Sequence, residues 1–400
     1  MSQHGSPWGV KAPRSHSSRP RQQRQPHAAC HAAHPRRQKR RDTGHHMETN
    51  QSGRDHLSEL IAEPVLDAAY AWLCRRRQDY PAHADIWAFR RQWPAEKTRI
   101  RADLLAGRYT ISLLDRITRA DGEECDLWAA RDALVLKALA MVLGKALPSS
   151  RHCTHLKGHG GAKGAVRRVL RHLPSYRFVL KTDVRKYYAS IDHHRLLAQV
   201  APWMPDPHLM NLIGQYLKRR AERGGLVWDY RRGIPLGCPL SPILGAFYLY
   251  ELDVQMAHCN WWYLRYMDDI LVLAPTRWKL RQAVRVVNQA LGALDLEKAS
   301  DKTFIGRIEK GFDFLGYHFS QEGLMVAQKT IERFVARATR LYEQSRETPG
   351  GASRLGDYVS RWVGWVRGGI RRAGVPVLGY SSTLGCEATS SLPPCLDHFW

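Results

Sequence analysis

Two adjacent aspartates, Asp268 and Asp269, lie between two short apolar runs. Residues 263–266 and 270–274 are mostly apolar over four to five residues, as buried strands are, so residues 267–269 are predicted to form the tight turn of a hairpin. Two carboxylates at the edge of an apolar sheet are electrostatically costly unless the turn faces water or a divalent cation lies beside them.

A third carboxylate, Asp183, bears on that choice. It ends a strand-like run, residues 176–183, and a helical apolar pattern follows at once. A strand ending in Asp183 next to a hairpin tipped with Asp268 and Asp269 would bring acidic oxygens to one point. Such hard ligands suit Mg²⁺, and two ions about 3.5–4 Å apart can activate an attacking hydroxyl and stabilise a leaving pyrophosphate. Three solvated surface aspartates are the alternative, because an Asp-Asp pair alone is weak evidence.

Five segments resemble the motifs of the reverse transcriptases, and especially those of the bacterial group II intron-like branch. They are residues 182–191 and 232–244 (the first two palm motifs), 266–269 (Tyr-Met-Asp-Asp, the polymerase signature), 301–303 (the fourth motif) and 311–317 (the primer grip). Their order and spacing argue against chance.

Strands alternating with helices around a hairpin indicate an α+β fold with an antiparallel sheet. The resemblance implies a right-hand polymerase with fingers, an antiparallel-sheet palm and a short helical thumb. It also implies an RNA-directed DNA polymerase, which is a nucleotidyltransferase. Such an enzyme uses dNTPs as substrates and binds an RNA template and a DNA or RNA primer. Its expected cofactors are two Mg²⁺ ions, with Mn²⁺ as an alternative.

The resemblance carries roles onto particular residues. Asp183 and Asp268 are expected to bridge the metal ions, with Asp269 as a secondary ligand and the backbone carbonyl of Val184 completing one shell. Lys302 is expected to donate a proton to the leaving pyrophosphate or to pair with it, and an ordinary surface lysine is the alternative.

The nucleotide-binding residues are expected to include Tyr188, which is at the position of the reverse transcriptase steric gate. A bulky ring there clashes with a ribose 2′-hydroxyl and so selects deoxynucleotides. Gly237 is expected to allow close approach of the template-primer backbone. Leu236 departs from the relatives, most of which carry Gln there to hold the incoming nucleotide, and relaxed fidelity is the resulting hypothesis. Arg119 is the single basic residue found where relatives have two that reach the triphosphate.

Two further segments are expected to contact template or primer. Residues 156–164 are Gly-rich and basic, with Lys157 and Lys163, but lack the Gly-Lys-Ser/Thr ending of a phosphate-binding P-loop. A plain flexible connector is the alternative for this segment. Phe314, Leu315 and Gly316 would form the primer grip.

The charge of the chain agrees with a polyanionic partner. The 400 residues carry a formal net charge of +24, from 61 Lys and Arg against 37 Asp and Glu. Residues 1–46 supply +9 of this excess and the remainder +15, so the body of the chain is basic too. The eight cysteines lack any Cys-x-x-Cys spacing, and ordinary reduced thiols are favoured over a zinc site at residues 152–155. No apolar run reaches the length of a membrane span, and the chain is expected to be cytoplasmic.

The predicted domain order follows the composition. Residues 1–46 are predicted to be a disordered basic tail, with a start at Met47 or a transit peptide as alternatives. Residues 47–170 are assigned to the fingers, mostly helical, 171–322 to the palm, 323–372 to the thumb, and 373–400 to an irregular tail. Within these regions we expect helices after Pro239, at 278–294, at 329–347 and at 355–370. Trp362 and Trp365 are expected to pack in the core rather than stack on bases.

Other functions share these motifs. The runner-up polymerase is a defence-associated, template-independent enzyme on the same fold. A maturase-like RNA-binding protein with vestigial polymerase activity is a different class, disfavoured because binding alone does not require Asp183, Asp268 and Asp269. The sequence identifies neither the RNA that is copied nor its primer, nor the oligomeric state, and a retroelement and a domesticated relative both fit.

Overall fold

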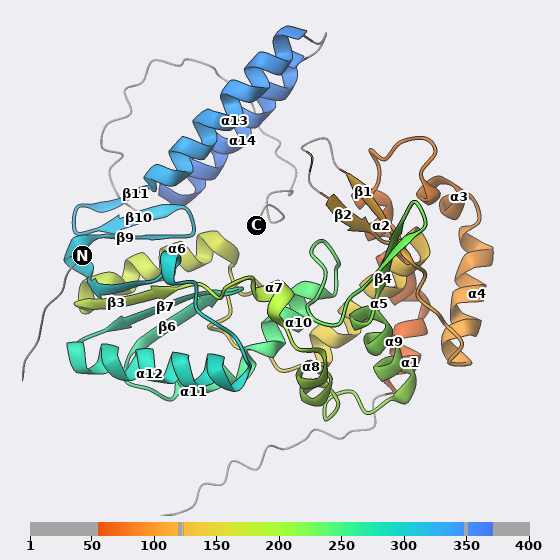
Figure 1. Ribbon diagram of the computed structural model, residues 1–400, viewed down its shortest axis with the longest axis horizontal. Coiled ribbons are helices and arrows are strands. Elements are labelled where there is room, and N and C mark those ends of the chain that lie inside the picture. The colour runs from red at the N-terminus through yellow and green to blue at the C-terminus, as the bar shows by residue number, and fades with distance from the viewer. Residues whose placement is uncertain (1–54, 119–121, 123, 348–350, 371–400) are drawn as a thin grey trace, which may run out of the picture. The chain divides into compact units, whose positions relative to one another are not determined.

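A four-stranded antiparallel sheet, in the order β6-β7-β3-β8, carries the acidic residues in the computed structural model (Figure 1). Its strands are β3 (Phe178–Thr182), β6 (Trp262–Tyr266), β7 (Asp269–Ala274) and β8 (Phe304–Arg307). Thr182 pairs with Ile270, and Tyr266 pairs with Asp269. The end of β3 and the β6–β7 turn therefore meet at one edge of the sheet. The predicted hairpin and the antiparallel sheet are confirmed.

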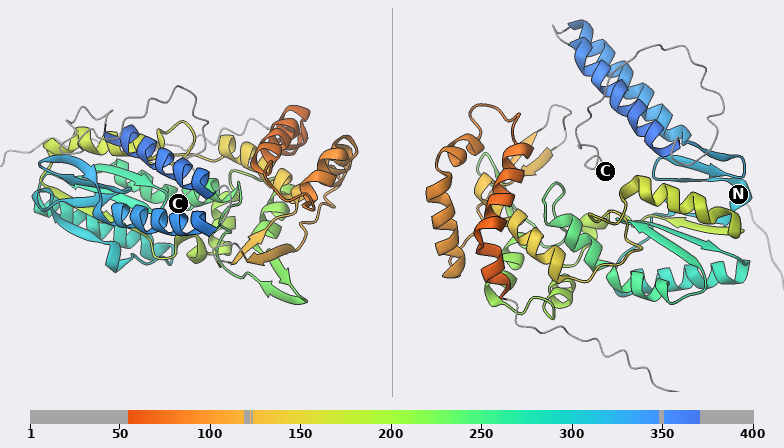
Figure 2. Two further views of the ribbon diagram at one scale, coloured as in Figure 1. Left: turned by 90° about the horizontal axis from the view of Figure 1, so that it is seen from above. Right: turned by 180° about the vertical axis from the view of Figure 1, so that it is seen from behind.

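Both faces of this sheet are covered, which is why β7 is buried along its whole apolar length. Leu271 and Leu273 pack with α6 (Gly161–His172) on one face. Val272 packs on the other face with α11 (Tyr250–Ala257) and α12 (Arg277–Ala293). Figure 2 shows α6 and the α11–α12 pair on opposite sides of the strands. The predicted helix at 278–294 is confirmed as α12.

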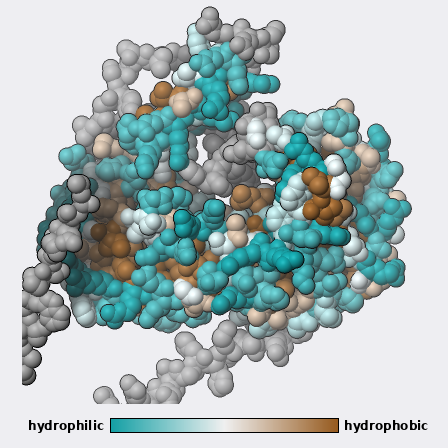
Figure 3. All heavy atoms as spheres, viewed as in Figure 1, coloured by the Kyte–Doolittle hydropathy of each residue, from teal (hydrophilic) through white to brown (hydrophobic). Residues whose placement is uncertain are grey.

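The first part of the described chain is mostly helical, as predicted, but it also holds a second sheet. Its helices are α1 (His56–Ile61), α2 (Glu63–Arg76), α3 (Asp85–Arg91), α4 (Trp93–Leu105) and α5 (Ala130–Ala146). The sheet, in the order β2-β1-β4-β5, comprises β1 (Leu114–Thr118), β2 (Glu124–Leu127), β4 (Arg220–Arg223) and β5 (Leu226–Asp229). These strands are short and largely exposed, so no apolar periodicity marked them. Figure 3 shows an apolar patch near the tip of β4 and β5, where Leu226 is 66% exposed.

The connection between the sheets holds short helices. They are α7 (Tyr187–Ser190), α8 (His193–Val200), α9 (Pro207–Leu217) and α10 (Ser241–Tyr248), with a 3₁₀ turn at Leu173–Ser175 before β3. The single helix predicted after Pro239 is in fact two, because the backbone breaks at Leu249 between α10 and α11. This break turns α11 onto the sheet, where Leu252 and Met256 are buried.

The last elements are a small sheet and a pair of helices. The sheet, in the order β11-β10-β9, contains β9 (Phe312–Phe314), β10 (Tyr317–Ser320) and β11 (Gly323–Val326), and is preceded by 3₁₀ turns at Ser300–Lys302 and Ile308–Lys310. The helices are α13 (Gln328–Glu347) and α14 (Gly351–Ile370), close to the predicted bounds. Phe334 and Trp362 stack between them with ring centroids 4.0 Å apart, so Trp362 packs within the helix pair.

The structure describes residues 55–118, 122, 124–347 and 351–370. The predicted tails at 1–46 and 373–400, the possible start at Met47, and Arg119 lie outside these residues. Within them, no helix combines the length and apolarity that crossing a membrane would need. The bounds assigned above to fingers, palm and thumb stay predictions.

Candidate active site

Asp183 and Asp268 form the centre of the candidate site. Asp183 follows β3 directly and is 8% exposed, while Asp268 lies in the two-residue turn between β6 and β7. The two carboxyl groups interact electrostatically. Burial, and then the charges of Asp183 and Asp269, raise the pKa of Asp268 to about 7. Burial also raises the pKa of Asp269 to about 6, although Lys181 opposes the shift. The site therefore concentrates negative charge that the protein alone neutralises incompletely.

Lys302 supplies a positive charge beside these carboxylates. Its Nζ lies 2.6 Å from Oδ2 of Asp183, and this hydrogen bond raises the pKa of Lys302. The lysine is held there by its neighbours, because the Thr303 hydroxyl lies 2.7 Å from that of Thr182 and the Ala299 amide donates to the Asp183 carbonyl at 2.8 Å. The Lys302 side chain is still 58% exposed and so can reach a ligand beside the carboxylates.

The donor set has the chemistry of a magnesium site with two protein carboxylates. Among the described residues, no group of three or more His, Cys, Asp or Glu side chains is arranged to hold a metal ion. Asp183 and Asp268 nevertheless converge as a pair, with Asp269 next in the chain. Mg²⁺ usually takes one or two carboxylates and completes its shell with waters and substrate phosphates, so this pair fits it. Val184 is buried directly after Asp183 and bridges to Lys298.

Tyr188 lies beside the carboxylates at the start of α7. A methyl group placed on Gly245 of α10 would lie 2.9 Å from Cε1 of Tyr188, so the glycine makes room for the ring. The Tyr188 hydroxyl is buried and has no hydrogen-bond partner among the described residues. Burial, and then the charge of Asp268, raise the pKa of Tyr188 far above its ordinary value. The neighbouring Tyr187 is buried and donates to the Gly245 carbonyl, which anchors α7 on α10.

The other predicted nucleotide contacts lie on the loop before α10. Leu236 is 76% exposed, and Gly237 has a φ of +80°, which favours glycine. The loop is tied back to α7, because the Ile234 amide donates to the Tyr188 carbonyl at 2.8 Å. Leu236 thus projects into solvent from a loop anchored next to the predicted steric gate.

The two predicted lysine contacts lie in different surroundings. Lys157 is exposed. Lys163 instead packs over the Trp365 ring, 3.9 Å from its centroid, and donates to the Trp365 carbonyl at 2.5 Å and to the Tyr317 hydroxyl. Burial, and then Arg167, lower the pKa of Lys163 to about 7. Lys163 therefore joins α6 to α14 in this structure.

The predicted primer grip is the hairpin turn between β9 and β10. Phe314 pairs with Tyr317, so Leu315 and Gly316 form a two-residue turn with φ of 49° and 81°. A methyl group on Gly316 would lie 3.0 Å from the ring of Trp365, so α14 lies directly against this turn.

Sequence reasoning missed a buried ionic network behind the turn. Arg265 of β6 is 0% exposed and makes a two-point ion pair with Asp253 of α11, at 2.9 and 2.5 Å. Tyr263 also donates to Asp253, at 2.7 Å. Burial would lower the pKa of Arg265, but Asp253 holds it well above its usual value. An arginine inside an otherwise apolar strand was the signal that could have pointed to a partner.

A comparison with known protein families matches the middle of this chain. Residues 132–319 match the family model described as "Reverse transcriptase (RNA-dependent DNA polymerase)". This part of the chain is similar to the reverse transcriptases. The matched segment contains Asp183, Asp268 and Lys302, and its fold is the right-hand polymerase fold. The match supports an RNA-directed DNA polymerase, which is a nucleotidyltransferase, and reverse transcriptase domains generally depend on divalent metal ions.

More specific likenesses are distant. The chain is 25% identical over 288 residues to Protein YkfC of Escherichia coli (strain K12), and the match covers 60% of this chain and 76% of YkfC. Two solved structures, titled "Partial Cas6-RT-Cas1--Cas2 complex" and "Cas6-RT-Cas1--Cas2 complex", match 60% of this chain at 17% identity with a TM-score of 0.38. This chain covers 42% and 26% of those chains and so spans less than half of either.

Proposed function

We propose that this protein is a reverse transcriptase that extends a primer on an RNA template by nucleotidyl transfer from dNTPs, with Asp183 and Asp268 holding two Mg²⁺ ions. The observation that carries the proposal is the convergence of these two carboxylates at one sheet edge, with Lys302 2.6 Å from Asp183. Bound Mg²⁺ would lower the pKa of the primer 3′-hydroxyl and neutralise charge on the pyrophosphate. Mn²⁺ has the same ligand preference and is the alternative ion.

The chain's own residues have separate tasks in this proposal. Asp183 and Asp268 fix the reacting groups in line, with Asp269 and the Val184 carbonyl as further ligands. Lys302 pairs with the leaving pyrophosphate, which its exposed ammonium group can reach. Gly237 lets the template-primer backbone approach closely.

The bounds of the subdomains follow from the same proposal. Residues 47–170 act as fingers, 171–322 as palm and 323–372 as thumb, with Arg119 and Lys157 contributing positive charge to nucleotide and template. Phe314, Leu315 and Gly316 hold the primer end. Lys163 serves the primer indirectly, by tying α14 to α6 beside that turn.

Primer extension tests the proposal. Purified protein, Mg²⁺ and dNTPs are incubated with a primed RNA template, beside an Asp268→Ala variant. Extension by the wild type alone supports the proposal. Tight RNA binding with no extension by either protein contradicts it and favours the maturase-like function. Extension that needs no template favours the defence-associated polymerase.

Tyr188→Ala is expected to lower discrimination against ribonucleotides by about 10- to 100-fold, because the ring that would clash with the 2′-hydroxyl is removed. The measurement compares kcat/KM for dNTP and NTP incorporation opposite the same template base. Tyr188→Phe is the matched control, since it keeps the ring and removes only a hydroxyl that has no hydrogen-bond partner among the described residues, and it should leave sugar selectivity unchanged. Equal selectivity in wild type and Tyr188→Ala contradicts the steric gate.

Leu236→Gln is expected to lower misincorporation by about tenfold, the equivalent of one added hydrogen bond to the correct nucleotide. The exposed position of Leu236 admits the longer polar side chain without repacking. Sequencing of cDNA copied from a defined RNA measures the error rate. The same error rate in both proteins would remove the hypothesis of relaxed fidelity.

The biological role is proposed from the sequence motifs. A bacterial retroelement or a domesticated relative of one is the proposed context, on the group II intron-like motifs of the sequence. A cytoplasmic location agrees with this context. Sequencing the RNA that copurifies with the protein would identify the template.

A further inference from the structure

The turn that carries Asp268 is held in a costly backbone conformation. Met267 has a φ of 54°, in the left-handed region that residues other than glycine rarely adopt. Both of its backbone groups are bound by side chains. Its amide donates to Nδ1 of His155 at 3.0 Å, and its carbonyl accepts from Nη1 of Arg265 at 2.7 Å. These two bonds offset the conformational cost and fix the residue just before Asp268.

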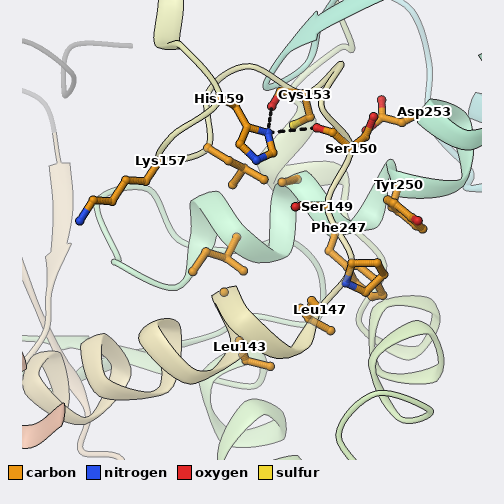
Figure 4. Close-up of a pocket in the computed structure, with 15 residues that line it drawn as sticks. Leu143, Leu147, Ser149, Ser150, Cys153, Lys157, His159, Phe247, Tyr250 and Asp253 are labelled. Atoms are coloured by element: carbon orange, nitrogen blue, oxygen red, sulfur yellow. Dashed lines mark hydrogen bonds between the residues drawn. The ribbon is translucent and has the colours of Figure 1, made fainter. Parts of the chain in front are cut away.

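The segment that carries His155 is attached to the free edge of β6. The Thr154 amide donates to the Arg265 carbonyl, and the Arg265 amide donates to the His152 carbonyl, both at 2.8 Å. His159 closes the segment on itself, with its Nδ1 3.1 Å from the Ser150 carbonyl and 3.0 Å from that of Cys153. Figure 4 shows this histidine pointing at both residues in the wall of a pocket of about 150 Å³.

The contacts of His155 assign its tautomer. Nδ1 accepts the Met267 amide, so the ring proton lies on Nε2, which faces the Pro242 carbonyl at 3.1 Å. Burial, and then Arg265, lower the pKa of His155 to about 4, so the ring is neutral near pH 7. The Cys153 thiol lies 3.4 Å from the same Nδ1, and burial raises its pKa to about 11, so it is a second, weaker donor.

We propose that His155 is a positioning residue for catalysis, which sets the place of Asp268 relative to Asp183 through its bond to the Met267 amide. This inference rests on the proposed function. The alternative role is a tether for α10 through Pro242. Because the two roles use different ring nitrogens, substitutions that each keep one nitrogen's contact can separate them.

His155→Asn places an amide oxygen near the Nδ1 position and keeps an acceptor for Met267, whereas His155→Gln places an amide nitrogen near the Nε2 position and keeps a donor to Pro242. If His155 positions the turn, His155→Gln loses about 10²-fold in kcat, as a displacement of about 1 Å does, while His155→Asn stays within about fivefold of wild type. His155→Ala, which loses both contacts, should match His155→Gln.

Hydrogen exchange gives a readout that does not depend on activity. Peptide-resolved exchange of the 264–269 segment should show the Met267 amide protected in wild type and His155→Asn and exchanging faster in His155→Gln and His155→Ala. Melting temperatures of the two amide variants check that they are equally folded. A His155→Gln enzyme as active as His155→Asn, or an unprotected Met267 amide in the wild type, overturns the inference.

Failure of the proposed function gives a different pattern. A wild type that fails to extend any primer overturns the proposed function and the catalytic role of His155 together, whatever the exchange data show. An active wild type with equal kcat in His155→Asn and His155→Gln overturns the role of His155 alone.

Discussion

Asp268→Asn is expected to lower kcat for nucleotide addition on the order of 10³- to 10⁴-fold, and yet to stabilise the metal-free protein. The amide keeps the shape of the side chain but removes the charge that would hold the metal ion. In the absence of metal, the same charge is unfavourable, because Asp268 is half-buried beside Asp183 and its pKa is raised to about 7. Removing it should raise the free energy of unfolding by about 1 to 3 kcal/mol at pH 8.

The gain in stability has a defined pH dependence. A carboxyl group whose pKa is raised by folding stabilises the folded protein fully at pH values below the pKa of the unfolded state, about 4. This stabilisation is lost as the pH rises through the pKa of the folded state, about 7. The advantage of Asp268→Asn over wild type should therefore be absent at pH 4, grow up to about pH 7 and stay constant above it.

Urea unfolding in EDTA and single-turnover extension in Mg²⁺ measure the two effects. Glu322→Gln makes the same charge change at an exposed turn and is the matched control, expected to alter neither. Addition of Mg²⁺ should raise the melting temperature of the wild type more than that of Asp268→Asn. If Asp268→Asn keeps kcat within tenfold of the wild type, or is less stable than the wild type in EDTA, Asp268 is not the metal ligand proposed here.

Arg265→Met is expected to lower the free energy of unfolding by about 3 to 5 kcal/mol. The substitution leaves the Asp253 carboxylate, 1% exposed, without its ionic partner. It also removes the donors to the carbonyls of Ala246 and Met267, at 3.0 and 2.7 Å. Because these groups connect α10, α11 and the turn, the loss should appear as global unfolding at lower urea concentration.

A second variant separates stability from catalysis. Asp253→Leu combined with Arg265→Met removes both charges and should recover part of the lost stability, with the Tyr263 hydroxyl left unpaired. Both variants should have a lower kcat than the wild type, because in each the Met267 carbonyl lacks the donor that fixes the turn before Asp268. A double variant as unstable as Arg265→Met would show that the ion pair is not the cause of the effect.

The sequence predicted those helices and strands whose apolar side chains recur at regular spacing along a short segment. The apolar runs on both sides of Asp268 and the stripes of α12, α13 and α14 needed no knowledge of distant contacts. The β1–β2 and β4–β5 hairpins were missed because β1 pairs with β4 across about a hundred residues and neither hairpin has a buried face.

The acidic residues of the candidate site could be predicted from the sequence. The residues that hold them in position could not. Asp183 and Asp268 lie at the ends of recognisable strands. His155 accepts a hydrogen bond from the Met267 amide, 112 residues away, and Asp253 of α11 pairs with Arg265 of β6. Nothing in the spacing of these residues indicates that they meet, because their contacts depend on the break at Leu249 and on a segment paired to a sheet edge.

The close approach of α14 to β10 limits which sequences this chain can tolerate. Any side chain at Gly369 would overlap the hydroxyl group of Tyr317, and one at Gly316 would press on Trp365. Both neighbours are held in place by Lys163, so neither can move aside freely. In a survey of all single substitutions, Gly369 should therefore be as intolerant as the acidic residues, although it lies fifty positions beyond the end of the matched family domain.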